Sequence, residues 1–315
     1  MPRTGSSLFA VLVATLATAA PAGAATVSVH DGRLLIAAAA GETNHIAVLR
    51  DGDGLRVADA ATPLAISAGC RPLPIGAVTG AVCGALQVTG VTVIAGDGDD
   101  RVLIDTSAPA TERALLAAAS PQHQVDGGAG KDEVEVRDGD AQVTGGEGDD
   151  SVRTGKGRDR VDGGPGNDTV VPGCGDDHAK GGDGADRMRP GYGPEKPSAS
   201  DCHGTSDDDT VDGGRGDDDL DAGGGSDTVD GGEGNDTVVP GCGSDQAKGG
   251  EGADRMRPGH GPVKQDGSDC HGEADDDTVD GGPGDDDIDA GNGDDRVDGG
   301  PGDDTIVPGL SLIHI

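Results

Sequence analysis

A nine-residue unit repeats along most of this chain, and its two constant positions limit what the chain can fold into. The strings GGPGNDTVV at 163–171, GGEGNDTVV at 231–239 and GGPGDDTIV at 299–307 are three copies of it. In each copy the sixth residue is aspartate and the eighth is apolar. A disordered acidic polymer has no reason to keep two positions in register, so the pattern indicates a repeat architecture.

Seventeen units fit this pattern, and they begin at 95, 127, 145, 154, 163, 172, 181, 204, 213, 222, 231, 240, 249, 272, 281, 290 and 299. The sixth residue is aspartate in all seventeen, and the eighth is apolar, with Ala179, Met188, Ala247 and Met256 as variants. A further unit at 136–144 has Ala141 at the sixth position.

The residue types of the unit follow from the turn and the strand that it is predicted to form. Its first six residues must turn sharply, which glycine permits because it tolerates positive φ and close backbone approach. Its last three residues predict a short strand whose one apolar side chain points inward. Two units then form one coil, and coils stack about 4.8 Å apart as parallel strands. The sequence therefore predicts an all-β fold, a parallel β-roll over 95–307. Such a narrow interior needs no aromatic residues, and the 315-residue chain has 60 Gly, one Phe, one Tyr and no Trp.

The aspartates of such a roll stack in rows, because units on the same side are two apart. Asp150 is expected near Asp168, and Asp168 near Asp186. Carboxylates at that spacing repel unless a cation lies between them. Calcium suits such a site because it takes six to eight oxygen ligands, whereas magnesium retains its waters. Zinc is not expected, because no Cys/His cluster recurs in the turns.

The predicted metal ligands are the seventeen aspartates Asp100, Asp132, Asp150, Asp159, Asp168, Asp177, Asp186, Asp209, Asp218, Asp227, Asp236, Asp245, Asp254, Asp277, Asp286, Asp295 and Asp304. Ten same-side pairs follow one another without interruption, from 132/150 to 286/304, so we expect about ten calcium ions.

The repeat resembles the RTX, or hemolysin-type, calcium-binding family, whose nonapeptide binds calcium in a parallel β-helical fold. The resemblance covers about two-thirds of the chain. It implies that the sixth-position aspartates bind calcium between successive turns and that the eighth-position residues form the core. Many members are exported by means of a C-terminal signal, whereas this chain has the pattern of an N-terminal signal, so we expect it to use the general export route. No hydrolase, protease or pore-forming segment accompanies the repeats, so the resemblance does not predict an enzyme.

The N-terminus has the pattern of a secretory signal peptide at 1–25. A basic start at Arg3 precedes an apolar run from Leu8 to Ala20 and a small-residue cleavage site at 22–24. A membrane anchor is the alternative, but the run is short for a span. We therefore expect a secreted, extracellular protein. The formal charge of −36 argues against nucleic acid and anionic membranes as partners.

Residues 26–94 differ from the repeats. Short alternating apolar runs separated by Gly and Asp turns predict a small N-terminal β domain that caps the roll. Cys70 and Cys83 lie in this region, and in an oxidising compartment they are expected to form a disulfide.

A 68-residue super-repeat begins at 172, since Cys174 corresponds to Cys242 and Cys202 to Cys270. Each copy holds one enlarged unit, at 190–203 and at 258–271. These units and the cysteine-bearing units lie two apart, so we expect disulfides Cys174–Cys202 and Cys242–Cys270. A soft-metal site is the alternative, but the nearby His178 corresponds to Gln246 in the second copy.

Two functions remain open from the sequence. The chain is either a secreted calcium-binding structural or surface protein, or an accessory segment of a longer exoenzyme or adhesin. Residues 308–315 begin the next repeat with Pro308 and Gly309 and then leave its pattern. The tail LSLIHI at 310–315 resembles a translated transposon-end sequencing adapter, so we expect it to be an assembly artefact. A genuine apolar C-terminal cap is the alternative.

Overall fold

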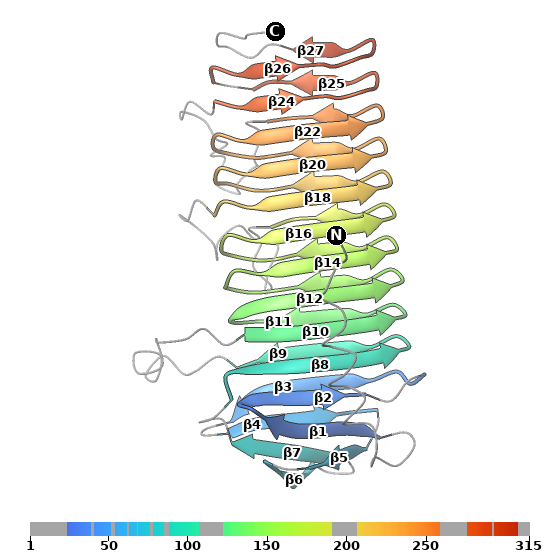
Figure 1. Cartoon of the computed structure of the whole chain (residues 1–315), viewed down its shortest axis with the longest axis vertical. Coiled ribbons are helices and arrows are strands. Elements are labelled where there is room, and N and C mark those ends of the chain that lie inside the picture. The colour runs from blue at the N-terminus through green and yellow to red at the C-terminus, as the bar shows by residue number, and fades with distance from the viewer. Residues whose placement is uncertain are drawn as a thin grey trace, which may run out of the picture.

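The computed structural model describes residues 24–38, 41–51, 54–61, 63–67, 69–75, 78–84, 88–106, 122–190, 207–258, 276–291 and 293–307. The predicted signal peptide lies outside these residues except for its last two positions, and so does the predicted truncated repeat at 308–315. Within the described residues all regular structure is strand, and no helix could span a membrane. From residue 90 onward the strands stack in chain order along an elongated body, and the strands of residues 25–84 lie at one end of it (Figure 1).

The strands form two sheets. The first sheet has thirteen strands in the order β26 (Arg296–Asp298), β24 (Thr278–Asp280), β22 (Gln246–Glu251), β20 (Thr228–Glu233), β18 (Thr210–Arg215), β16 (His178–Asp183), β14 (Arg160–Pro165), β12 (Asp140–Glu147), β10 (Gln122–Ala129), β8 (Gly90–Asp97), β2 (Arg33–Ala37), β1 (Ala25–His30) and β5 (Leu64–Ile66).

The second sheet has fourteen strands in the order β27 (Thr305–Val307), β25 (Asp287–Asp289), β23 (Arg255–Met256), β21 (Thr237–Val239), β19 (Asp219–Asp221), β17 (Arg187–Met188), β15 (Thr169–Val171), β13 (Ser151–Arg153), β11 (Glu133–Val136), β9 (Arg101–Asp105), β3 (His45–Asp51), β4 (Gly54–Asp59), β7 (Val78–Gly84) and β6 (Cys70–Ile75).

The predicted parallel β-roll is confirmed. From β8 and β9 onward the chain alternates between the sheets, and each strand pairs in parallel with the strand one coil later. The register aligns equivalent repeat positions, as in Val161 with Ala179 and Val211 with Val229. The eighth-position side chains form one continuous buried core, to which Met188, Leu220 and Ile288 contribute with no exposed surface.

Strand lengths differ from the expected three residues in the first sheet. There the strands from β8 to β22 have six to eight residues, while many second-sheet strands keep three. The first-sheet strands continue into the glycines that open the next unit, and these glycines pair across coils, as in Gly182 with Gly214. Both have left-handed φ values, 127° and 109°, which glycine adopts without strain.

The N-terminal strands extend the same two sheets. The hairpins β1–β2 and β3–β4 are antiparallel, but β2 pairs in parallel with β8, and β3 with β9. The predicted boundary at residue 94 falls inside β8. The buried core also runs without a break from Ala25 in β1 to Val297 in β26. This end therefore covers the first coil by continuing its sheets.

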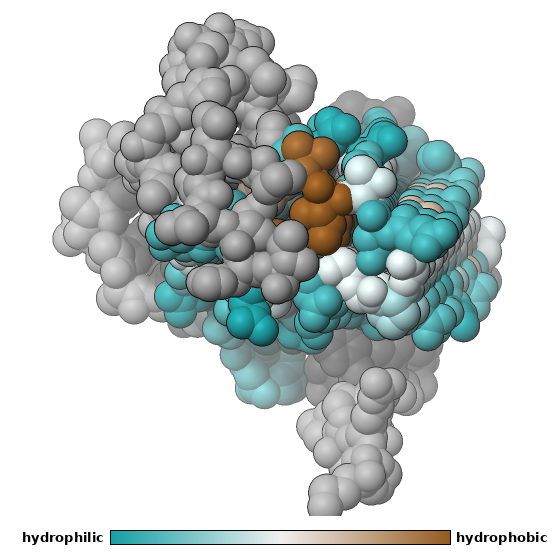
Figure 2. All heavy atoms as spheres, turned by 90° about the horizontal axis from the view of Figure 1, so that it is seen from above, coloured by the Kyte–Doolittle hydropathy of each residue, from teal (hydrophilic) through white to brown (hydrophobic). Residues whose placement is uncertain are grey.

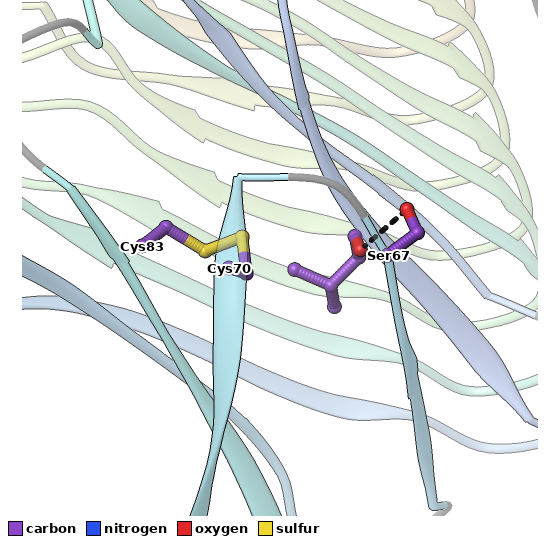
Figure 3. The surroundings of a disulfide bond; sticks show 4 residues. Ser67, Cys70 and Cys83 are labelled. Carbon is purple, nitrogen blue, oxygen red and sulfur yellow. Dashed lines mark hydrogen bonds between the residues drawn. A yellow bond between two sulfur atoms is a disulfide. The ribbon is translucent and has the colours of Figure 1, made fainter.

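The predicted Cys70–Cys83 disulfide is confirmed. The two residues are directly opposite in the antiparallel pair β6–β7, with Cα atoms 4.2 Å apart. Figure 3 shows this bond beside Ser67, whose hydroxyl donates to the Val27 carbonyl oxygen over 3.2 Å. Short links of this kind tie the outermost strands of the cap together.

At the other end of the roll, seen from above, a small hydrophobic group lies beside hydrophilic residues (Figure 2). The described chain ends there with β27, where Val307 is 47 % exposed.

Replacing Leu220 with alanine should test the importance of the narrow core. Leu220 lies in β19 with no exposed surface. Its truncation should lower the free energy of unfolding by about 2–5 kcal/mol, because little can move into the space between two single rows of side chains. Urea denaturation in calcium measures this. Leu49→Ala is the control, since Leu49 is 38 % exposed and should cost much less. Equal losses would contradict the prediction.

Candidate metal centre

The seventeen predicted aspartates lie in two rows along the two edges of the roll, each just before a strand. The first edge, where the chain passes from the first sheet to the second, holds Asp100, Asp132, Asp150, Asp168, Asp186, Asp218, Asp236, Asp254, Asp286 and Asp304. The second edge, where it returns, holds Asp159, Asp177, Asp209, Asp227, Asp245, Asp277 and Asp295.

Hydrogen bonds join each row into a ladder. The backbone N–H of each aspartate donates to Oδ1 of the next aspartate on its edge, as from Asp168 to Asp186 over 2.7 Å and from Asp177 to Asp209 over 2.8 Å. Fifteen such bonds occur, nine on the first edge and six on the second. The ladder places one carboxylate per coil on each edge.

Five stacked pairs cross insertions that were expected to interrupt the rows. They are 100/132, 177/209, 186/218, 245/277 and 254/286. The intervening segments 107–121, 191–206 and 259–275 each lie between a second-sheet strand and the following first-sheet strand. The coil on either side keeps its register, so the sequence count of ten uninterrupted pairs was too low.

At the N-terminal end of each row of aspartates, the residue in the next position is uncharged. On the first edge, the Asn44 backbone N–H and its side-chain amide both donate to Asp100 Oδ1. Asn44 thus occupies the aspartate position of the coil below, which sequence reasoning missed. Its signal was Asn44-His45-Ile46, which has the spacing of Asp-x-apolar. On the second edge the Ala141 backbone N–H donates to Asp159 Oδ1 over 2.8 Å.

In twelve of these aspartates the other carboxylate oxygen is buried without a hydrogen-bond partner. This holds for Oδ2 of Asp100, Asp132, Asp150, Asp168, Asp177, Asp186, Asp209, Asp218, Asp227, Asp236, Asp254 and Asp286. A buried charged oxygen with no partner is costly. A bound cation or a proton would therefore stabilise these oxygen atoms.

Burial makes these carboxylates hard to ionise without a cation. It raises the pKa of Asp177 to about 9 and that of Asp227 to about 8, with the adjacent carboxylates of each row adding to the shift. On the first edge, burial raises the pKa of Asp168 to about 7. In each case a backbone N–H donor acts in the opposite direction, but desolvation is the larger effect.

Backbone oxygens accompany the carboxylates. A Cβ atom placed on Gly163 would lie 2.5 Å from Asp168 Oδ2 and 2.8 Å from the Gly181 carbonyl oxygen of the next coil. Within the described residues no three Asp, Glu, His or Cys side chains converge on one point. A cation here must therefore be held by carboxylates together with glycine carbonyls. This all-oxygen set fits calcium, although the role of each aspartate as a ligand stays a prediction.

Cys174 and Cys242 lie on the second edge. Cys174 forms a β-bridge with Lys156, and Cys242 forms one with Gly224, in neighbouring turns. Both cysteines are disulfide-bonded. Their predicted partners Cys202 and Cys270 lie outside the described residues, so the pairing stays a prediction.

Peptide mapping without reduction should recover Cys174–Cys202 and Cys242–Cys270. The reason is that the repeat spacing predicts that each pair belongs to turns on one edge in adjacent coils. A bridge there would attach each enlarged unit to the roll. The same digest after reduction is the control. A Cys174–Cys242 link, or free thiols at these positions, would contradict the pairing.

Comparison with known proteins agrees with the geometry. Four segments of the chain, residues 136–170, 175–191, 203–238 and 271–306, match the model of a family described as the RTX calcium-binding nonapeptide repeat. The matched family is a calcium-binding repeat and not a catalytic one. A search of curated proteins found no match.

Proposed function

The chain carries the repeats of the RTX calcium-binding family, and from this premise we propose that it is a secreted structural protein whose roll is completed by extracellular calcium. One observation supports this above the others. Two continuous rows of aspartates form fifteen stacked pairs, and twelve of these aspartates present a buried oxygen without a hydrogen-bond partner. A roll that served only as a spacer would gain nothing from a buried carboxylate in every coil, because burying a charge is costly.

In the proposed site, the aspartate side chains and the glycine backbone have different roles. The aspartate backbone ladder fixes each carboxylate through Oδ1, which leaves Oδ2 for a ligand. The glycine carbonyls of the adjoining coil supply further oxygens. Bound calcium would supply the positive charge that allows both carboxylates of a stacked pair to stay ionised. The fifteen stacked pairs set the maximum number of sites between pairs on the described residues.

Equilibrium dialysis of the full chain after metal removal tests the proposal. We expect several calcium ions to bind to each chain, and an equal concentration of magnesium should displace few of them because magnesium retains its waters. Failure to bind calcium would overturn the proposal.

Secretion is a separate part of the proposal and rests on the signal-peptide pattern at 1–25. N-terminal sequencing of material recovered from the culture medium tests it. We expect the mature chain to begin close to Ala25. A protein that stays in the cell with its N-terminus intact would overturn this part and leave calcium binding unaffected.

A further inference from the structure

The two edges differ at the first position of the repeat unit. On the first edge this position is glycine from the second coil on, at Gly127, Gly145, Gly163, Gly181, Gly213, Gly231, Gly249, Gly281 and Gly299. On the second edge five of the seven aspartate-bearing units begin with a buried side chain, at Thr154, Pro172, Ala222, Pro240 and Ala290, and the other two begin with Gly204 and Gly272, which lie outside the described residues. The aspartate follows five residues later on both edges, so the difference lies in what faces the carboxylate.

Space, and not backbone conformation, requires the first-edge glycines. In the unit 231–239, Gly232 and Gly234 have left-handed φ values of 112° and 147°, whereas Gly231 does not have a left-handed φ. A Cβ on Gly231 would instead overlap with Asp236 Oδ2 and with the Gly249 carbonyl oxygen. A Cβ would likewise overlap with Oδ2 of the unit's own aspartate and with a glycine carbonyl oxygen of the next coil at Gly145, Gly163, Gly181, Gly213, Gly249 and Gly281. On the first edge this space is therefore lined by oxygen.

On the second edge a buried side chain starts at the corresponding point. Thr154, Ala222 and Ala290 have no exposed surface. Their Cβ atoms cannot lie where the first edge places a carboxylate oxygen, because the two atoms would overlap. The Asp227 carboxylate keeps its ladder bond through Oδ1, and its buried Oδ2 has no hydrogen-bond partner. Because its unit begins with Ala222, this Oδ2 cannot pack against the backbone of the first residue as Asp236 Oδ2 packs against Gly231.

We propose that the first residue of each unit sorts the calcium sites into two classes, with tight sites on the first edge and weaker sites at the second-edge units that begin with a larger residue than glycine. This inference rests on the proposed function. Calcium needs six to eight oxygens at about 2.3–2.6 Å, and a buried carbon atom beside the carboxylate removes both room and oxygens. The three longest connections, which contain 107–121, 191–206 and 259–275, also all join a second-sheet strand to the following first-sheet strand, at the second edge.

Calcium titration of the metal-free full chain by calorimetry, with bound ions counted by dialysis, tests the inference. The wild type should bind in two phases that differ roughly tenfold or more in dissociation constant. Asp236→Asn on the first edge should remove ions from the tight phase. Asp227→Asn, its matched control on the second edge, should remove them only from the weak phase. Circular dichroism in saturating calcium should show that both variants keep the fold.

Exchanging the first residues gives a second comparison. Gly231→Ala should lose tight sites, and Ala222→Gly should convert weak sites to tight ones. If Gly231→Ala does not fold, the two asparagine variants still decide the outcome. A single phase that both asparagine variants reduce equally would overturn the inference while leaving calcium binding intact. A wild type that binds no calcium would instead overturn the proposed function.

Discussion

Removing calcium should convert the circular dichroism spectrum of this protein from that of a β-sheet to that of a coil near neutral pH. Without the ion, the roll must bury stacked carboxylates that repel one another, in a chain with a formal charge of −36. Ordering each residue costs about 1–2 kcal/mol, and the 60 glycines are the most costly type to order. A core of two single rows of small side chains offsets little of this, so the ion's binding free energy becomes folding free energy.

A titration from chelator to roughly millimolar calcium measures the transition. Asp227→Ala should raise the calcium midpoint more than Asp304→Ala. Asp227 is stacked between Asp209 and Asp245, whereas Asp304 ends the row with Asp286 as its one described neighbour. An unchanged spectrum across the titration would contradict the coupling. Because Asp304 lies on the other edge, Asp295→Ala at the end of the row that holds Asp227 is the matched variant, and a midpoint equal to that of Asp227→Ala would mean that position in the row does not matter.

The repeat pattern was sufficient to predict the parallel roll, because a period of nine with one apolar position allows few ways to bury that position. Val161, Ala179 and Val211 lie in register across three coils, as the spacing required. The enlarged units were harder to interpret. An insertion changes the sequence spacing, but the coils on either side still pair, as the Asp177–Asp209 bond shows. Loop closure depends only weakly on length, so spacing alone cannot reveal whether a row is interrupted.

The difference between the two edges was also present in the sequence, but its meaning required the structure. Glycine at Gly231 and alanine at Ala222 are both compatible with a turn. Only the coordinates show that the place of a Cβ on Gly231 is occupied by two oxygens. Asn44 was missed for a similar reason, since one residue outside the repeats carries no periodicity.

Acid should partly replace calcium. The folded-state pKa of Asp177 is about 9, that of Asp227 about 8 and that of Asp168 about 7, all above the ordinary value of 3.8. The metal-free roll therefore binds more protons than the unfolded chain does between about pH 4 and pH 9. Its stability from these groups is fully present below about pH 4 and is lost as the pH rises through the folded values. Metal-free protein that is a coil at pH 8 should gain β structure as the pH falls toward about 4.5.

In the presence of calcium, acid should destabilise the roll, because protons compete with the ion for the same oxygens. The calcium midpoint should therefore rise on acidification. Circular dichroism in metal-stripped buffers measures both trends, and sedimentation must show that the acid form is monomeric.

Asp177→Asn imitates the protonated carboxyl and should stabilise the metal-free roll near neutral pH. Asp183→Asn is the control, because Asp183 is exposed and its hydrogen bond from Arg215 lowers its pKa, so this change should not stabilise. A monomeric metal-free chain that stays a coil at pH 4.5, with Asp177→Asn no better than Asp183→Asn, would show that buried negative charge is not what keeps the roll unfolded without calcium.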